Sequence, residues 1–348
     1  MLRRDMNRFS AVTASNALCA LHKVGLPRDR LSRMRLLVYR KLLRRPERTF
    51  HTRLADYAEH RLQKSLSNFS FILDRRSPGT TLIEFGTGAM GADLAVAYLL
   101  GYEKIITCDI NDHLDFENFS QIVRKVEGRL EDISRQFGVP AGALQDRWEV
   151  LRQTDGKEHL YRLGIIEFLP FSRLLETPLP TIDLWYSEST LQRVPAYQLE
   201  SFSRHVSDNL AADALVFHKL DLADIHTQPH YPFYIPSAHR FDFLRYQDWL
   251  WKIMNNDLYS SQNRFRIPHY LQIFGKLGLH LRHGRFVRYA ADEEYLNGLS
   301  LPATFSRYSM HALSVAHAKL LMAPGVVESP LVENFEVPDD GSFLALDW

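Results

Sequence analysis

The chain has 348 residues, with 42 Lys and Arg against 41 Asp and Glu, and therefore a formal net charge of +1. This balance gives no overall electrostatic attraction to nucleic acid. Its two cysteines, Cys19 and Cys108, lie in unrelated contexts, which excludes a disulfide framework and a CxxC metal site and favours a reducing, cytoplasmic setting. No apolar run approaches the roughly 20 residues of a membrane span, so no membrane association is expected.

Residues 1–76 are expected to form a helical extension, because apolar side chains such as Leu31, Met34 and Leu54 recur at helical spacing. The extension is also rich in arginine. A solvated helix face is the simplest explanation of this charge. The alternatives are a lid with cationic contacts to an acidic substrate, or a phosphate-binding surface.

Residues 81–110 are expected to form a strand, a glycine turn, a helix and a second strand. Gly86, Gly88 and Gly91 let the backbone turn sharply and approach a ligand closely. Asp109 ends the second strand, where a carboxylate roughly 20 residues past the glycines can bind both hydroxyls of a ribose. The pattern therefore predicts a nucleotide site at the end of the first strand.

The same glycines satisfy the dinucleotide pattern GxGxxG, so an NAD site is one alternative. Two features argue against it: Glu84 stands two residues before the first glycine, and the rest of the chain supplies no second nucleotide-binding half. A carboxylate at this place suits a ligand that presents a cationic amine. An ordinary strand–helix–strand turn without a cofactor is the remaining alternative.

The string E-x-G-x-G-x-x-G, followed by a strand that ends in Asp109, resembles motif I and the acidic ribose position of class I S-adenosylmethionine (SAM) dependent methyltransferases of small-molecule type. The resemblance implies SAM as the cofactor and an α/β fold with a seven-stranded Rossmann-like sheet flanked by helices. It places Glu84 near the amino acid end of SAM. The contacts that it implies in this stretch are Glu84, Phe85, Gly86, Thr87, Gly88, Gly91, Asp109 and Ile110.

Between residues 114 and 170 the pattern is less regular. A long amphipathic helix is expected over residues 114–136, and the segments Trp148–Leu151 and Leu160–Ile166 are candidate strands. In the methyltransferase family, adenine is usually bound by a side chain after the third strand. The resemblance therefore makes Ile166 and Glu167 the candidate adenine contacts.

Residues 181–194 predict an apolar strand that leads into a polar turn, and they are similar to the fourth strand of the methyltransferase fold. Ligands of open α/β sheets bind outside the carboxyl ends of the strands. Ser187 and Glu188 are therefore expected to face the methionine end of SAM. For Glu188, a surface carboxylate that begins a helix is the alternative.

A helix over residues 197–210 and a strand over 214–220 come next, followed by an insertion over about 224–266 that is dense in aromatic residues and histidine. This composition suits a closed pocket for a small organic substrate, although the aromatics could equally form a satellite core. The stretch from Asn263 to Arg266 also resembles an NR-x-R segment of some bacterial small-molecule methyltransferases. Candidate substrate contacts are Tyr234, Arg245, Asn263 and Arg264.

Methyl transfer to oxygen or nitrogen needs positioning and the removal of a proton. The candidate bases near the end of the fifth strand are Asp221, His226, His230 and Tyr231. Asp221 and Asp224 alone are too few carboxylates to predict a metal site.

The C-terminal third is expected to contain a helix ending near Gly275, a strand over residues 279–289 and a last strand over 312–322 that pairs antiparallel with it. These expectations divide the chain into an extension (1–76), a SAM-binding domain (77–323) and a tail (324–348).

Three classes of function remain open. The first is methylation of oxygen or nitrogen on a small metabolite, in a biosynthetic role. The second keeps the fold but cleaves or cyclises the aminobutyrate arm of SAM. The third is methylation of nucleic acid or protein, or SAM binding without turnover; nucleic acid is disfavoured because no Asn/Asp-Pro-Pro-Tyr/Phe motif follows the fourth strand.

Overall fold

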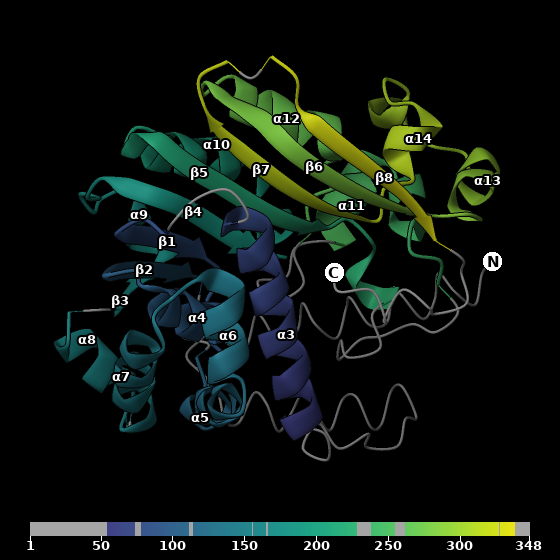
Figure 1. The fold of residues 1–348 in the computed structure, drawn as a ribbon. Coiled ribbons are helices and arrows are strands. Elements are labelled where there is room, and N and C mark those ends of the chain that lie inside the picture. The colour runs from purple at the N-terminus through teal and green to yellow at the C-terminus, as the bar shows by residue number, and fades with distance from the viewer. Residues whose placement is uncertain are drawn as a thin grey trace, which may run out of the picture.

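The computed structural model describes residues 54–73, 78–110, 114–154, 156–164, 166–227, 238–254, 262–326 and 328–337. These residues form an eight-stranded sheet in the order β3-β2-β1-β4-β5-β7-β6-β8 (Figure 1). The strands are β1 (Thr81–Phe85), β2 (Lys104–Asp109), β3 (Ile166–Pro170), β4 (Ile182–Glu188), β5 (Leu210–Asp221), β6 (Leu279–Tyr289), β7 (His317–Pro324) and β8 (Leu331–Val337).

Strands β3, β2, β1, β4 and β5 are parallel neighbours. Strand β7 lies between β5 and β6 and runs antiparallel to both, and β8 pairs parallel with the outer edge of β6. The carboxyl ends of β1, β2, β4 and β5 consequently meet at one edge. The Rossmann-like α/β class and the antiparallel pairing of β6 with β7 are confirmed, and the sheet has one strand more than expected.

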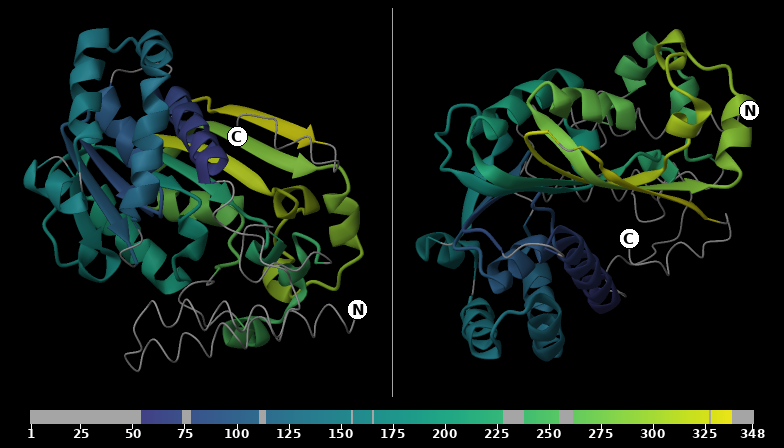
Figure 2. Two further views of the ribbon diagram at one scale, coloured as in Figure 1. Left: turned by 90° about the horizontal axis from the view of Figure 1, so that it is seen from below. Right: turned by 45° about the horizontal axis from the view of Figure 1, so that its top comes forward.

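Helices cover both faces of the sheet, below and above it in Figure 1, and Figure 2 shows the two layers from other sides. The first face carries α3 (Leu54–Leu73), α4 (Ala92–Leu100), α5 (Phe116–Glu127), α6 (Leu130–Phe137), α7 (Ala141–Arg152) and α8 (Lys157–Arg162). The second carries α9 (Phe171–Leu174), α10 (Ala196–Ser207) and α12 (Ile267–Gly275). A third apolar cluster near the end of β6 involves short elements: η3 (Asp242–Arg245), α11 (Asp248–Met254), α13 (Asp292–Asn297), η4 (Ala303–Phe305) and α14 (Met310–Leu313).

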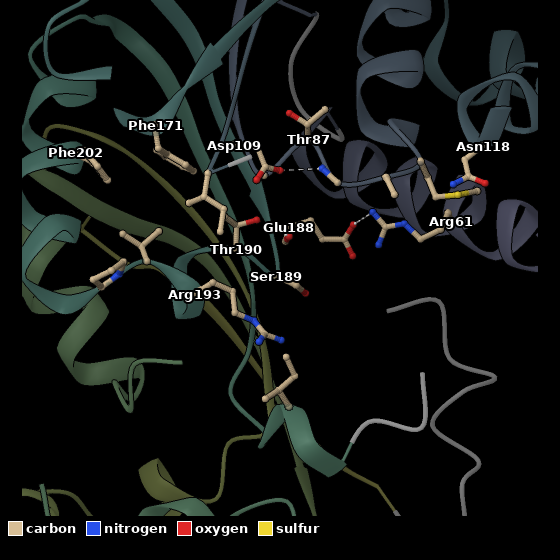
Figure 3. Close-up of a pocket in the computed structure, with 18 of the residues that line it drawn as sticks. Arg61, Thr87, Asp109, Asn118, Phe171, Glu188, Ser189, Thr190, Arg193 and Phe202 are labelled. Atoms are coloured by element: carbon tan, nitrogen blue, oxygen red, sulfur yellow. Dashed lines mark hydrogen bonds and ion pairs between the residues drawn. The ribbon is translucent and has the colours of Figure 1, made fainter. Parts of the chain in front are cut away.

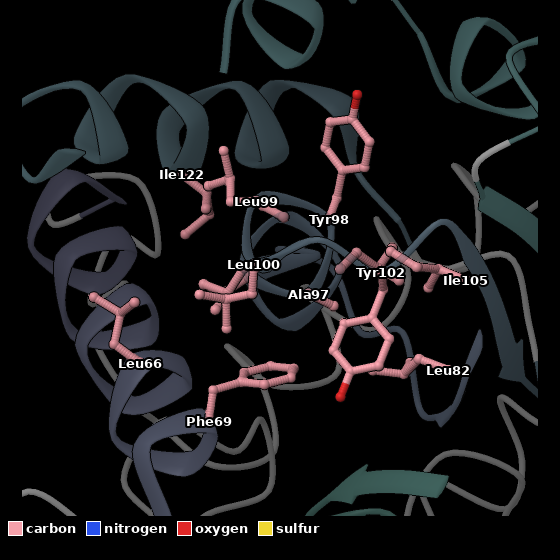
Figure 4. Packing of buried hydrophobic residues seen from close by; sticks show 14 of the residues in the cluster. Leu66, Phe69, Leu82, Ala97, Tyr98, Leu99, Leu100, Tyr102, Ile105 and Ile122 are labelled. Carbon is pink, nitrogen blue, oxygen red and sulfur yellow. The ribbon is translucent and has the colours of Figure 1, made fainter. Parts of the chain in front are cut away.

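The first strand and helix form as the sequence predicts. Strand β1 is buried along its whole length, as expected for a parallel strand covered on both faces. Helix α4 begins after Gly91, with a φ of 59°, and is capped by Gly101, with a φ of 114°; both backbone conformations favour glycine. In Figure 4, Leu66 and Phe69 of α3 lie near Leu100 of α4. Helix α3 is therefore part of the main core.

The middle of the chain differs from the expectation. The single helix predicted over residues 114–136 is two helices, α5 and α6, separated at Gly128. The strand predicted at Trp148–Leu151 is wrong, because these residues lie in α7, where the Trp148 indole is buried and donates to the carbonyl of Val123. The strand predicted from Leu160 is also wrong at its start: Leu160 lies in α8, and β3 begins at Ile166.

The C-terminal part also departs from the prediction. The last expected strand starts at His317 rather than at residue 312, because residues 310–313 form α14. Strand β8 lies in the segment expected to be a tail. The division of the chain at residues 76 and 323 stays a prediction, although α3 and β8 both join the folded body.

Among the described residues, no helix combines the length and the apolar character that crossing a bilayer requires. Within the same part of the chain, no group of three or more His, Cys, Asp or Glu side chains is placed to hold a metal ion.

Candidate functional site

A pocket of about 410 Å³ opens at the carboxyl ends of β1, β2 and β4 (Figure 3). Its wall combines the glycine turn, the end of β2, helix α3 and the chain after β4, including the turn η1 (Leu191–Arg193). The lining residues are Tyr57, Arg61, Gly86, Thr87, Gly88, Ala89, Met90, Asp109, Ile110, Asn118, Phe171, Glu188, Ser189, Thr190, Arg193, Val194, Pro195, Gln198, Phe202 and Ile225.

The glycine turn exposes backbone atoms to the pocket, because its glycines have no side chains. Gly86 and Gly88 have φ angles of 93° and 62°, in the left-handed region that L side chains rarely adopt. A Cβ atom on Gly86 would lie 1.9 Å from Oγ1 of Thr190. Both glycines line the pocket, whereas Gly91 serves as the N-cap of α4 and packs against Leu114 and Phe119.

Asp109 presents its carboxylate at the same turn. The Gly88 amide donates a hydrogen bond to Oδ2 of Asp109 over 3.2 Å, a contact drawn in Figure 3. Ile110, the next residue, is 48% exposed and also lines the pocket. The arrangement offers a carboxylate to hydroxyl groups of a ligand and an apolar side chain beside it.

Glu84 lies behind the turn instead of lining the pocket. Its side chain is buried, and Oγ1 of Thr107 donates to it over 2.7 Å. Burial raises the pKa of Glu84 well above its usual value, and the charges of Asp93 and Asp109 act in the same direction, while Thr107 and Arg61 oppose them. The surroundings of Glu84 therefore favour the protonated form of its carboxyl group.

Glu188 is the pocket carboxylate that the fold keeps charged. It is buried, so the alternative of a helix-initiating surface carboxylate is wrong. Arg61 lies 2.8 Å from it, Lys64 2.5 Å and Lys219 3.8 Å. Burial opposes ionisation, but the three cations outweigh it and hold the pKa of Glu188 well below its usual value.

Arg61 connects Glu188 to a second buried carboxylate. Its Nη2 lies 3.5 Å from Oδ2 of Asp93, and the Tyr186 hydroxyl donates to the other oxygen of Asp93 over 2.6 Å. The Asn68 amide in turn donates to the Tyr186 hydroxyl over 2.9 Å. Helix α3 is thus joined to the end of β4 by a chain of charged and polar contacts at the pocket.

Ser187 points away from the pocket. Its hydroxyl lies 2.8 Å from Nδ1 of His218, and both residues are fully buried. Burial lowers the pKa of His218 to about 3, so its imidazole is neutral at pH 7. The pair belongs to the packing between β4, β5 and α12, where His218 stacks on Phe274.

The predicted adenine contacts also lie elsewhere. Ile166 is buried in the core, and Glu167 faces Lys104 at 3.7 Å; neither is among the lining residues. Phe171, which directly follows β3, lines the pocket and packs against Phe85 at 4.9 Å between ring centroids. Phe85 itself is buried beneath the turn.

The predicted substrate contacts that the structure describes have supporting roles. Asn263 donates to the carbonyls of Leu191 and Val194 over 2.8 and 3.0 Å and so holds the turn after β4. Arg264 donates to the carbonyls of Phe243 and Tyr246. The Arg245 guanidinium lies 5.3 Å from the ring centroid of Tyr246.

Among the candidate bases, Asp221 is described and lies 3.5 Å from Nδ1 of His317. His230 and Tyr231 lie outside the described residues, as does the predicted substrate contact Tyr234. His226 belongs to the short turn η2 (Ile225–Thr227), but its side chain is outside the described part.

Several pocket residues were not predicted as contacts: Tyr57, Arg61, Asn118, Phe171, Thr190, Arg193 and Phe202. For Arg61 the sequence carried a weak signal, since one interpretation of the basic extension was a lid with cationic contacts. The others come from helices and turns whose proximity depends on the fold.

No protein-family model and no curated protein matches the chain. Among solved structures, the magnesium protoporphyrin IX methyltransferase of Synechocystis PCC 6803 with bound SAH is similar at 11% identity and a TM-score of 0.40, over 84% of this chain and 94% of that one. A geranyl diphosphate methyltransferase in complex with SAM is similar at 13% identity and a TM-score of 0.40, over 80% and 92%. The mitomycin 7-O-methyltransferase gives 12% and 0.36; 76% of this chain matches 54% of that chain. Similarity at this level assigns no activity to the chain.

Proposed function

We propose that the chain is a SAM-dependent methyltransferase that acts on oxygen or nitrogen of a small acceptor. The observation that carries the proposal is the joint placement of Gly86, Gly88 and Asp109 at the mouth of β1 and β2. Bare backbone beside a carboxylate at this sheet edge suits the ribose of a nucleoside ligand.

In this proposal each part of SAM meets its own lining residues. Asp109 would bind the ribose hydroxyls, and Ile110, Phe171 and Asn118 would offer apolar surface and an amide to adenine. Arg61 lines the same pocket from α3, and Glu188 and Asp93 raise the pKa of Arg61 against the effect of burial. A permanently charged guanidinium suits the carboxylate of the methionine part.

When bound, SAM supplies a methyl group on a sulfonium, which is already activated and leaves behind a neutral thioether. For methyl transfer the protein therefore has to hold both reactants in fixed positions, exclude water and supply a group that takes a proton. A volume of about 410 Å³ lies near the lower end of small-molecule sites, which span roughly 300–1,000 Å³. It suits one nucleoside-sized ligand, with the acceptor approaching from beside it.

Calorimetric titration with SAM tests the proposal. Asp109→Ala is expected to weaken binding by about 10- to 100-fold, since hydrogen bonds to a charged group contribute about 1.5–3 kcal/mol. Asp132→Ala is the matched control, because Asp132 is exposed on α6 and pairs with Arg135. Equal affinity of the wild type and the Asp109 variant would contradict this placement of the cofactor.

A second experiment distinguishes methyl transfer from cleavage within SAM. The protein is incubated with SAM alone and then with SAM and a panel of small phenols, amines and carboxylic acids. Release of S-adenosylhomocysteine that depends on an acceptor supports methyl transfer. Release of methylthioadenosine without any acceptor would instead support cleavage within SAM.

A further inference from the structure

Arg193 lines the pocket from η1, the turn that follows β4. Its backbone amide donates to the carbonyl of Thr190 over 2.7 Å. Asn263 holds the same turn, because its backbone amide donates to the carbonyl of Gln192 over 2.8 Å and its side-chain amide donates to carbonyls on either side of Arg193. The hydroxyl of Tyr270, a buried residue of α12, donates in turn to Oδ1 of Asn263 over 2.9 Å. The backbone that carries Arg193 is therefore fixed before a ligand binds, which lowers the entropic cost of binding.

Arg193 belongs to a different wall of the pocket from the ribose-binding carboxylate of the proposed function. In the view of Figure 3, Glu188 and Ser189 lie between Asp109 and Arg193. Ile225, which follows β5, also lines the pocket and adds an apolar side chain. Since the parts of SAM have their own lining residues in the proposed function, the wall formed by Arg193 and Ile225 is left for the acceptor.

Positive charge predominates beside the end of β4. Arg61, Lys64 and Lys219 surround the single carboxylate of Glu188. Asp93 is the other carboxylate at Arg61, but burial raises its pKa and so favours its neutral form. The pKa of Lys219 lies well below its usual value, because the side chain is buried and because the charge of Lys64 disfavours a further cation. A surplus of positive charge at this place attracts an anionic ligand into the pocket.

The side chain of Arg193 suits an anionic group in particular. A guanidinium is permanently charged and has five N–H donors in a planar fork, and two parallel N–H groups match the oxygens of a carboxylate or a phosphate. With five donors, Arg193 can keep contacts to the protein and still bind such a group.

We propose that the acceptor carries an anionic oxygen group, a carboxylate or a phosphate, and that Arg193 is the specificity-determining residue that binds it. The group is held at η1, while the apolar part of the acceptor lies against Ile225. This assignment rests on the proposed methyl transfer, since it names the class of acceptor for the same pocket.

Binding of matched probes tests the proposal without a known acceptor. Benzoate, phenyl phosphate and the uncharged benzamide are titrated calorimetrically into the full chain saturated with S-adenosylhomocysteine, the product of methyl transfer. At least one of the two anions is expected to bind about 10- to 100-fold more tightly than benzamide, the gain typical of hydrogen bonds to a charged group. A preference for benzoate supports a carboxylate acceptor, and a preference for phenyl phosphate supports a phosphorylated one. Equal affinity for benzamide and both anions, or no binding of either anion, would overturn the proposal.

Arg193→Gln tests the residue itself. This variant is expected to reduce the preference for the anion to less than about threefold, with unchanged affinity for S-adenosylhomocysteine. Arg204→Gln is the matched control, because Arg204 is exposed on α10 and does not line the pocket. An anion preference that survives in Arg193→Gln would overturn the assignment to Arg193.

If Arg193→Gln does not fold, Arg193→Lys serves in its place. Lysine keeps the charge but not the planar fork, so the affinity for the preferred anion is expected to fall by about three- to tenfold. Unchanged affinity for both anions would overturn the role of the guanidinium. Failure of the wild type to bind S-adenosylhomocysteine would count against the proposed function, and titration of the three probes into the chain alone would then still test Arg193.

Discussion

Glu84 stands one residue before the end of β1, Glu188 ends the neighbouring parallel strand β4, and both are buried, at 1% and 8% exposure. Around Glu84, burial and two nearby carboxylates raise the pKa. Around Glu188, burial acts in the same direction, but Arg61, Lys64 and Lys219 reverse it. The comparison shows that depth alone does not fix the charge of a carboxyl group at this sheet edge; the cations brought by α3 and β5 decide it.

The largest expected effect comes from removing the charge of Glu188. Glu188→Gln leaves Arg61, Lys64 and Lys219 close together without their shared counter-ion. Breaking a buried ion pair in this way costs about 3–5 kcal/mol of unfolding free energy. Denaturant unfolding at pH 7 measures it, with the surface variant Glu149→Gln as control. A loss no larger than that of the control would contradict the account of Glu188.

Arg61→Gln removes one cation and leaves Lys64 and Lys219 beside Glu188. The expected loss of unfolding free energy is smaller, about 1.5–3 kcal/mol, the range for a hydrogen bond to a charged group. The same variant is expected to weaken SAM binding in calorimetry, since Arg61 also lines the pocket. A stability loss equal to that of Glu188→Gln would mean that Lys64 and Lys219 do not help to neutralise the carboxylate of Glu188.

The stability difference between the wild type and Glu188→Gln is expected to depend on pH in a defined direction. Because the pKa of Glu188 is lower in the folded state, its ionised carboxylate stabilises the fold at pH values above the usual pKa of 4.5. This contribution disappears as the pH falls through the folded-state pKa. The difference should therefore be constant from pH 8 to 5 and shrink below about 4.5, by at most about 1.4 kcal/mol per pH unit. Urea unfolding at each pH measures it; a difference that grows in acid would contradict the lowered pKa.

Glu84→Gln is expected to have the smallest effect and the opposite pH dependence. A glutamine oxygen can still accept the Thr107 hydrogen bond, so at pH 4 the variant should lie within about 1 kcal/mol of the wild type. Because the pKa of Glu84 is higher in the folded state, its protonated carboxyl group contributes stability that is fully present below the usual pKa of 4.5. This contribution is lost as the pH rises through the folded-state pKa. The variant should thus gain stability relative to the wild type between pH 5 and 8, and a relative loss would show that Glu84 is ionised.

The stretch from β1 to β2 could be predicted because its signals are local: apolar strand residues, glycines and a terminal aspartate. The contacts of Glu188 could not, since Arg61 stands more than a hundred residues earlier and meets it only once α3 packs on the sheet. Trp148 favoured a strand by its type, yet tertiary packing against α5 fixed a helix. The contact of His317 with Asp221 could not be predicted either, because it depends on the pairing of β5 with β7.

Strand β8 changes what the sheet offers to a second molecule. Without it, the outer edge of β6 would present a row of unpaired amides and carbonyls, which is a template for association between sheets. Strand β8 covers that edge and places Glu333 next to Arg285 and His283 of β6. Strand β8 carries Glu333 and Glu336 among its apolar residues. Pairing of another strand with β8 would bury these charges, which is costly. A chain shortened before Leu331 would therefore lose resistance to aggregation before it lost the pocket.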